Sequence, residues 1–179
     1  IAQVADQVHT HRDRLKWILI AGPSSSGKTT FAKRLAVQLK VNGLRPVTIS
    51  TDNYFVDRNK TPRGESGEFD FENIETIDLP LFNEHMERLD RGEEVDMPYF
   101  NFEMGKRESR GEKLRIAGDQ LVLVEGIHAL NPRLTRSVPV EHKLKVYISA
   151  LTQLNLDSNN RISTTDNRLV RRLVRDHMF

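Results

Sequence analysis

A phosphate-binding pattern is the clearest chemical signal in this sequence. Residues 22–29 read Gly-Pro-Ser-Ser-Ser-Gly-Lys-Thr and match G-x-x-x-x-G-K-[ST] at every fixed position. A short apolar run precedes the pattern and a helical period follows it, which is the context that the motif requires. Backbone N–H groups in such a loop can surround phosphate oxygens, and the positive end of the following helix faces the anion. The pattern therefore predicts a site for nucleotide phosphates.

The residue types in this loop fit that task. Glycine lets the chain curl closely around an anion. Lys28 can reach the β- and γ-phosphates, and Thr29 can offer its hydroxyl to Mg²⁺. The residues that we expect to bind the nucleotide are Gly22, Ser24, Ser25, Ser26, Gly27, Lys28, Thr29 and Thr30. The alternative is a tight strand-to-helix turn that merely carries a lysine.

Two carboxylates follow apolar runs elsewhere in the chain. Asp52 comes just after a predicted strand at 46–50, and Glu125 ends the run 120–125. In a parallel sheet these positions share one edge with the phosphate loop. Asp52 could then take the proton of an acceptor hydroxyl, and Thr29, Asp52 and Glu125 could hold Mg²⁺. The alternatives are an Asx-turn at Asp52 and a surface carboxylate at Glu125.

The sequence lacks the marks of a GTPase switch. No aspartate is followed by glycine three residues later, and Asn59-Lys60 is followed by Thr61-Pro62 rather than by the x-D of a guanine reader. A kinase or a stand-alone ATPase that uses ATP and Mg²⁺ remains.

Strand and helix patterns alternate along the chain. Strands are predicted at 17–22, 46–50, 120–125 and 143–149, helices at 3–15, 28–42, 78–90 and from 165 or 166 to 179, a short aromatic stretch at 98–102 and a long polar loop at 56–68. Several strands are continuously apolar, which favours a parallel sheet covered on both faces. We therefore expect a doubly wound α/β domain of the P-loop NTPase type at 16–179, preceded by a helix or linker at 1–15.

Composition excludes several classes of protein. Hydrophobic residues make up 37% of the chain and charged residues 29%, cysteine is absent, and the net charge is +2. No apolar run approaches the roughly 20 residues of a membrane span. The arginines cluster at 161, 168, 171, 172 and 175, which favours small phosphate esters over nucleic acid as the ligand. We expect a cytoplasmic protein.

At these residues the chain resembles the uridine kinase family, in the larger group with phosphoribulokinase. The matching segments are GPSSSGKTT (22–30), TDNYF (51–55), FDFENIETID (69–78), PYFNFEMGKR (98–107), LVEGIHAL (123–130) and RLVRRLVRD (168–176), in the order of the family. More narrowly, the chain is similar to the uridine kinase-like module that follows a threonyl-tRNA-synthetase-like segment in some bacterial proteins. The resemblance implies transfer of the γ-phosphoryl group of ATP to a nucleoside-like acceptor.

The resemblance also implies roles for individual residues. Asp52 is expected as the general base, together with Lys28 and Arg175 as catalytic groups. Glu72 falls where the family places an aspartate on the ribose hydroxyls. The remaining residues expected at the acceptor are Tyr54, Phe100, Phe102, Arg107 and Arg172. Core packing is the alternative for Phe100 and Phe102.

The chain departs from the family pattern where the base is read. Phe100 and Gly105 stand where the family has a tyrosine and a histidine, so neither supplies a side-chain hydrogen bond. We therefore expect uridine and cytidine to be poor acceptors. Residues 152–167 exceed the family's short connection and are expected to cover the site, and the lid is expected to be incomplete at Phe179.

Two functions from different classes stay open at this point. The first is a nucleoside-type kinase. The second is an ATP-sensing P-loop binding module, conceivably on RNA, without transfer activity. The expected partners are a small nucleoside-like molecule and further domains of the same polypeptide, with neither a membrane nor nucleic acid; assembly into a homo-oligomer is left open.

Overall fold

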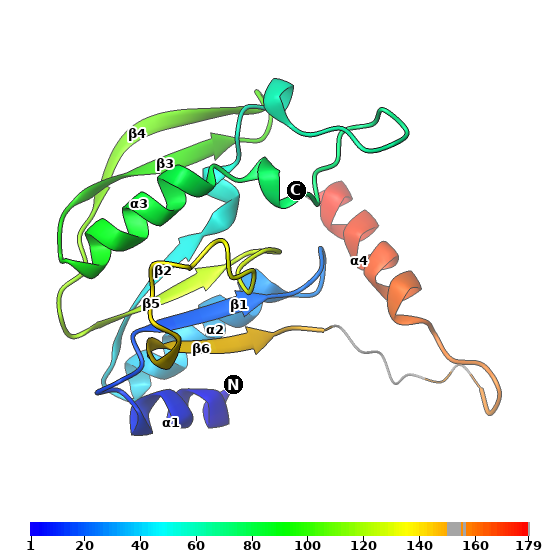
Figure 1. The fold of residues 1–179 in the computed structure, drawn as a ribbon. Helices are drawn as coiled ribbons and strands as arrows, with labels where there is room; N and C mark the ends of the chain where they lie inside the picture. Colours follow the sequence, from blue (N-terminus) through cyan, green and yellow to red (C-terminus); the bar gives the residue numbers. More distant parts are fainter. Residues whose placement is uncertain (150–154, 156, 179) are drawn as a thin grey trace.

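The computed structural model describes residues 1–149, 155 and 157–178. Its centre is a parallel sheet of four strands in the order β2-β5-β1-β6 (Figure 1). The strands are β1 (Trp17–Ala21), β2 (Arg45–Ser50), β5 (Gln120–Glu125) and β6 (Lys143–Tyr147). The predicted doubly wound α/β fold is confirmed.

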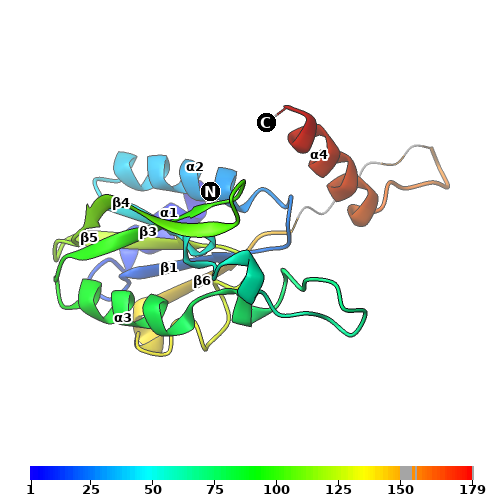
Figure 2. The ribbon, with the colours of Figure 1, turned by 90° about the horizontal axis from the view of Figure 1, so that it is seen from above.

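Helices cover both faces of this sheet, as Figure 2 shows from above. Helices α1 (Ala2–Thr10) and α2 (Lys28–Val41) pack on one face, and α3 (Leu79–Asp90) packs on the other. Alternate residues of one strand serve the two faces: Ile18 joins the α1–α2 core, whereas Trp17 and Leu19 join the α3 core. This double burial explains why the strand sequences are continuously apolar.

Helix α1 is part of this packing. Its Ala5 and Val8 are fully buried together with Leu35 and Leu39 of α2. The helix ends at Thr10, earlier than the predicted 3–15, and residues 11–14 form turns. The expected segment 1–15 therefore contributes to the core of the domain that follows it.

The antiparallel hairpin of β3 (Val95–Asn101) and β4 (Lys106–Leu114) was not predicted. The sequence analysis recognised only a short aromatic stretch at 98–102. Strand β4 is charged and almost wholly exposed, so it lacks the apolar alternation that identifies a strand. The hairpin packs against α3 and the 3₁₀ turn η1 (Thr51–Tyr54).

Short turns and one outlying helix complete the chain. The 3₁₀ turns are η2 (Arg58–Lys60), η3 (Ile74–Thr76) and η4 (Val140–His142). Helix α4 (Thr164–Met178) stands beyond the carboxyl ends of the strands, away from the sheet (Figure 1). It therefore faces the edge at which an α/β sheet binds its ligands.

Candidate active site

The phosphate loop joins β1 to α2 at the carboxyl edge of the sheet. Gly22 is packed under the backbone carbonyl of Ile148, which occupies the place that a Cβ atom would need. The loop is therefore pinned to the segment that follows β6. Helix α2 begins at Lys28, whose ammonium lies 3.4 Å from the carbonyl oxygen of Pro23. The first N–H groups of a helix have no partner within the helix, so those of α2 are available to an anion bound at the loop.

Two carboxylates stand beside this loop because β2 and β5 are neighbours. Ser50 pairs in register with Glu125 at the ends of these strands. Glu125 accepts hydrogen bonds from Thr29 Oγ1 at 3.3 Å and from Ser50 Oγ at 2.9 Å. Asp52 follows in η1, where its backbone N–H donates to Ser50 Oγ. The arrangement brings Lys28, Thr29, Asp52 and Glu125 to one place.

The electrostatics of Asp52 follow from this placement. Burial, and then the negative charge of Glu125, raise the pKa of the Asp52 carboxyl to about 6, although the Lys28 ammonium acts to lower it. A carboxyl with such a pKa can both take and return a proton near neutral pH. Perturbed groups of this kind are common at catalytic sites.

The same residues fit a divalent cation. In the described part of the chain no group of three or more acidic, histidine or cysteine side chains is arranged as a complete metal site. Mg²⁺ usually takes only one or two carboxylates and completes its shell with water and substrate phosphates. Thr29, Glu125 and Asp52 supply hard oxygen donors next to the phosphate loop. The donor set therefore suits Mg²⁺ that arrives with a nucleotide.

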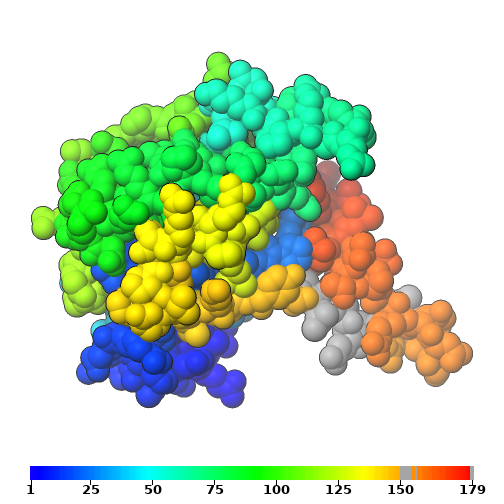
Figure 3. All heavy atoms as spheres, in the orientation of Figure 1, coloured from blue at the N-terminus to red at the C-terminus, as the bar shows by residue number. Residues whose placement is uncertain are grey.

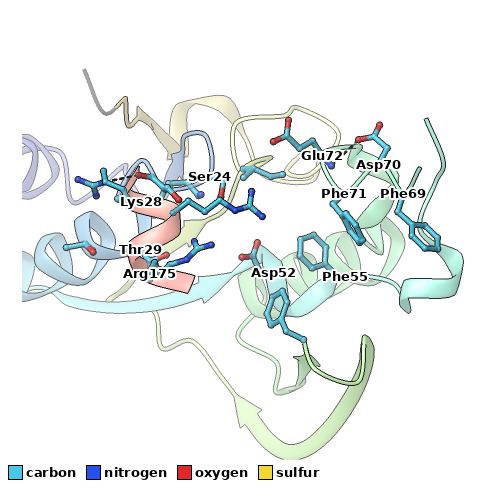
Figure 4. A pocket seen from close by; sticks show the side chains of 17 residues that line it. Ser24, Lys28, Thr29, Asp52, Phe55, Phe69, Asp70, Phe71, Glu72 and Arg175 are labelled. Carbon is cyan, nitrogen blue, oxygen red and sulfur yellow. Dashed lines mark hydrogen bonds between the residues drawn. The ribbon is translucent and has the colours of Figure 1, made fainter. Parts of the chain in front are cut away.

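A hollow lies beside α4 in the space-filling view (Figure 3). A cavity of about 870 Å³ opens over Thr29 and Asp52, whereas the buried Glu125 is not part of its lining (Figure 4). Its phosphate wall consists of Ser24, Ser25, Gly27, Lys28, Thr29 and Thr30. Its aromatic wall consists of Phe55, Phe69, Phe71 and Phe102, with Asp70 and Glu72 beside them. Figure 4 shows Asp52 between the two walls. Ile127 and three arginines complete the lining.

Those arginines come from α4. Arg171, Arg172 and Arg175 line the cavity, and Arg172 and Arg175 also contact Asp176 of their own helix. Arg171 Nε donates to the carbonyl of Ser25 at 3.1 Å, and Arg168 Nε donates to that of Ser24 at 3.0 Å. The helix thus rests on the phosphate loop through two arginines and points two others into the cavity.

Three of the expected acceptor residues do not line this cavity. Tyr54 is fully buried, with its hydroxyl 3.1 Å from His85 Nδ1 and its ring against Phe82. Arg107 makes a 2.8 Å ion pair with Asp78, the residue that caps α3. Phe100 is 6% exposed and lies behind Phe102 in a smaller neighbouring cavity. Phe102 and Glu72 do line the large cavity, as expected.

Gly22 and Ser26 also fall outside the lining, beneath the loop surface. Residues 152–167 were expected to cover the site. Residues 152–154 and 156 lie outside the described residues, and none of the others in that range lines the cavity.

Several lining residues were not predicted from the sequence as site residues. They are Phe55, Phe69, Asp70, Phe71, Ile127 and Arg171. Asp70 accepts from the backbone N–H of Glu72 at 3.1 Å and from the Asn73 side chain at 3.3 Å, so it also shapes its own loop. Asp70 lies in the segment FDFENIETID that carries the family resemblance, two residues before Glu72, and the resemblance favoured Glu72. For Arg171, the 168, 171, 172, 175 spacing on one helix face was a usable signal.

The chain is similar to known proteins over most of its length. A family model described as the phosphoribulokinase / uridine kinase family matches residues 17–177. The uridine kinase of Deinococcus deserti is 28% identical over 88% of this chain and 66% of its own length. The uridine kinase of Chloroflexus aurantiacus is 30% identical, again over 88% of this chain and 66% of its own length. The chain thus spans about two thirds of the length of these relatives.

A solved structure supports the fold. The chain titled "a Possible Uridine Kinase from Bacillus stearothermophilus" has a TM-score of 0.63 at 18% identity, over 81% of this chain and 79% of that one. The neighbouring threonyl-tRNA-synthetase-like segment suggested by the sequence stays a prediction. Since the family model covers nearly all of the sheet, the phosphate loop and α4, this chain belongs to the phosphoribulokinase / uridine kinase family.

Proposed function

We propose that this protein transfers the γ-phosphoryl group of ATP to a hydroxyl group of a small, nucleoside-like acceptor. The observation that carries the proposal is a single cavity with a phosphate loop on one side, an aromatic and acidic wall on the other, and Asp52 between them. Membership of the family supports the same chemistry. A site of about 870 Å³ suits two small substrates held face to face.

The phosphate wall binds the donor in this proposal. Backbone N–H groups and the Lys28 ammonium hold the β- and γ-phosphates, and the α2 N-terminus adds a favourable field. Thr29 and Glu125, with Asp52 nearby, would hold Mg²⁺, which supplies charge neutralisation when it is bound. Arg172 and Arg175 face the same space and can stabilise the charge on the transferred group.

Asp52 acts on the acceptor. Its carboxylate accepts the proton of the attacking hydroxyl as the new P–O bond forms and the bond to ADP breaks. Asp70 and Glu72 can accept hydrogen bonds from the other hydroxyls of the acceptor. The phenylalanines of the aromatic wall offer faces on which a planar ring can stack. An acceptor bound by these residues would have its reacting hydroxyl next to Asp52.

The deciding experiment is a screen of nucleosides and other small alcohols for stimulated ADP release in the presence of MgATP. Asp52→Asn serves as the comparator, because stimulation by a true acceptor must depend on the base. An ATP-sensing module would bind ATP and show no acceptor-dependent ADP release.

Other aspects of the setting are proposals as well. Among the described residues, no helix combines the length and apolar character that crossing a membrane requires. We propose that the protein acts in the cytoplasm and that the same polypeptide carries further domains. We also propose that it does not bind nucleic acid, since the arginines of α4 contact the phosphate loop and line the cavity.

A further inference from the structure

A second, smaller cavity of about 70 Å³ adjoins the first. It shares Phe55, Phe71 and Phe102 with the aromatic wall. Its other lining residues are Val56, Arg58, Thr61, Thr76 and Phe100. Phe55, Phe100 and Phe102 meet edge to face, at ring separations of 5.1 to 6.3 Å. The small cavity is thus an aromatic extension of the site, and no described residue of the phosphate loop lines it.

Arg58 is the charged residue among those that line this extension in the described part of the chain. Its Nη2 donates to the carbonyl of Phe102 at 2.6 Å, and its backbone N–H donates to the carbonyl of Gly105 at 2.8 Å. No other hydrogen bond of its side chain is found among the described residues. A guanidinium has five N–H donors, so most of them are free for a ligand.

Gly105 leaves room for Arg58. A Cβ atom at position 105 would lie 2.8 Å from Arg58 Nε and 2.9 Å from Arg58 Cζ. The glycine also has a φ of +62°, which other residues rarely adopt. A side chain at 105 would therefore require the arginine to move from its observed position. The Arg58 guanidinium thus lies where a side chain at 105 would otherwise begin.

The chemistry of this group is one-sided, because a guanidinium donates hydrogen bonds and accepts none. An amino group turned toward Arg58 would meet only donors, and one of the two groups would lose its partner. A carbonyl oxygen in the same place would be paired. Resting on the proposed function for where the acceptor binds, we propose that Arg58 selects nucleoside-like acceptors whose planar ring carries a carbonyl rather than an amino group on its outer edge.

Uridine and cytidine test this directly, because they share the sugar and the 2-carbonyl and differ only along one edge of the ring. Uridine has a 4-carbonyl beside N3–H, and cytidine has a 4-amino group beside an unprotonated N3. Their affinities are measured calorimetrically in the presence of Mg²⁺ and a non-hydrolysable ATP analogue, and their kcat/KM values are measured by ADP release. We expect uridine to be favoured about 10-fold; the far larger ratios of fully buried polar sites are not reached because Arg58 is exposed.

Arg58→Gln should bring the two affinities within about 3-fold, because an amide can turn either its donor or its acceptor to the ring. The matched control is Lys60→Gln, which removes the same charge from the same turn but lines neither cavity. It should preserve the wild-type ratio. Thermal melting establishes that both variants are folded.

Three outcomes would overturn the proposal: an unchanged ratio in Arg58→Gln, a wild-type preference for cytidine, or binding of neither nucleoside. The binding arm separates this inference from the proposed function. If uridine is bound selectively through Arg58 but ADP release is not stimulated, the kinase proposal fails and the role of Arg58 stands. If ADP release is stimulated but the uridine-to-cytidine ratio does not change in Arg58→Gln, the kinase proposal stands and the role of Arg58 fails.

Discussion

The two walls of the cavity are built in different ways. The phosphate wall grows out of β1 and α2, and its acidic partners stand at the ends of β2 and β5, in register across the sheet. The aromatic wall comes from residues 55, 69–72 and 102, which lie outside the sheet, in turns, loops and two isolated bridges. The regular hydrogen bonds of a parallel sheet therefore place the donor side, whereas isolated bridges, single loop hydrogen bonds and side-chain packing place the acceptor side. A shared transfer chemistry can thus be kept while acceptor recognition differs.

The largest expected effect concerns the group between the two walls. Asp52→Asn should lower turnover by about 10²–10⁴-fold, the usual contribution of a general base, and leave ATP affinity within a few-fold. Steady-state kinetics and ATP titration measure the two quantities. Asp119→Asn, on the exposed ion pair with Arg45, is the control. Turnover close to wild type would assign Asp52 to turn formation instead.

Removal of the Lys28 ammonium tests whether the phosphate wall binds ATP. Lys28→Ala should weaken ATP binding by about 10- to 100-fold, because a charge-assisted contact to phosphate contributes roughly 1.5–3 kcal/mol. Lys33→Ala removes the same charge from an exposed position of the same helix and should bind ATP normally. Equal ATP affinity in both variants would mean that the loop is only a structural turn.

The raised pKa of Asp52 predicts the pH dependence of catalysis. As a base the carboxyl must be ionised, so kcat/KM should fall about tenfold per pH unit below about pH 6. A profile that stays flat down to pH 4.5 would separate Asp52 from the proton transfer.

Ionisation of Asp52 is required for catalysis but should lower the free energy of unfolding. The folded protein holds the Asp52 proton more tightly than the unfolded chain does, since the pKa rises from 3.8 to about 6. Ionisation therefore costs folding free energy as the pH rises through this window. Asp52→Asn should be more stable than wild type at pH 8, by on the order of 1–3 kcal/mol, and the gain should vanish near pH 4. Thermal or urea unfolding at both pH values measures it.

The smallest expected effect tests whether Arg107 belongs to the acceptor site. Arg107 pairs with Asp78, which caps α3, and does not line the cavity. Arg107→Met should therefore cost about 1 kcal/mol of stability and leave the KM of the acceptor unchanged. Urea unfolding and acceptor kinetics are the measurements. A large rise in KM with unchanged stability would return Arg107 to the substrate site, where the family resemblance placed it.

The sequence alone was enough to predict the segments whose positions in the fold follow from their order along the chain. A strand, a glycine-rich loop and a helix must follow one another in any P-loop, so residues 22–30 could be read directly. Asp52 and Glu125 could be predicted to lie close together because parallel strands end at one edge, and the register of β2 with β5 places Ser50, two residues before Asp52, opposite Glu125.

Tertiary structure decided what depends on packing between distant segments. Tyr54 and Phe100 are aromatic residues that suit either a core or a ligand, and only their neighbours place them away from the large cavity. Asp70 and Glu72 differ by two positions in a loop without a period, so no pattern could rank them. Arg58 and Gly105 are 47 positions apart in the chain but lie next to each other in the fold. Only the tertiary structure shows that the missing side chain at 105 leaves room for the guanidinium of Arg58. Local patterns specify backbone order, while the fit of side chains across the fold specifies which acceptor is recognised.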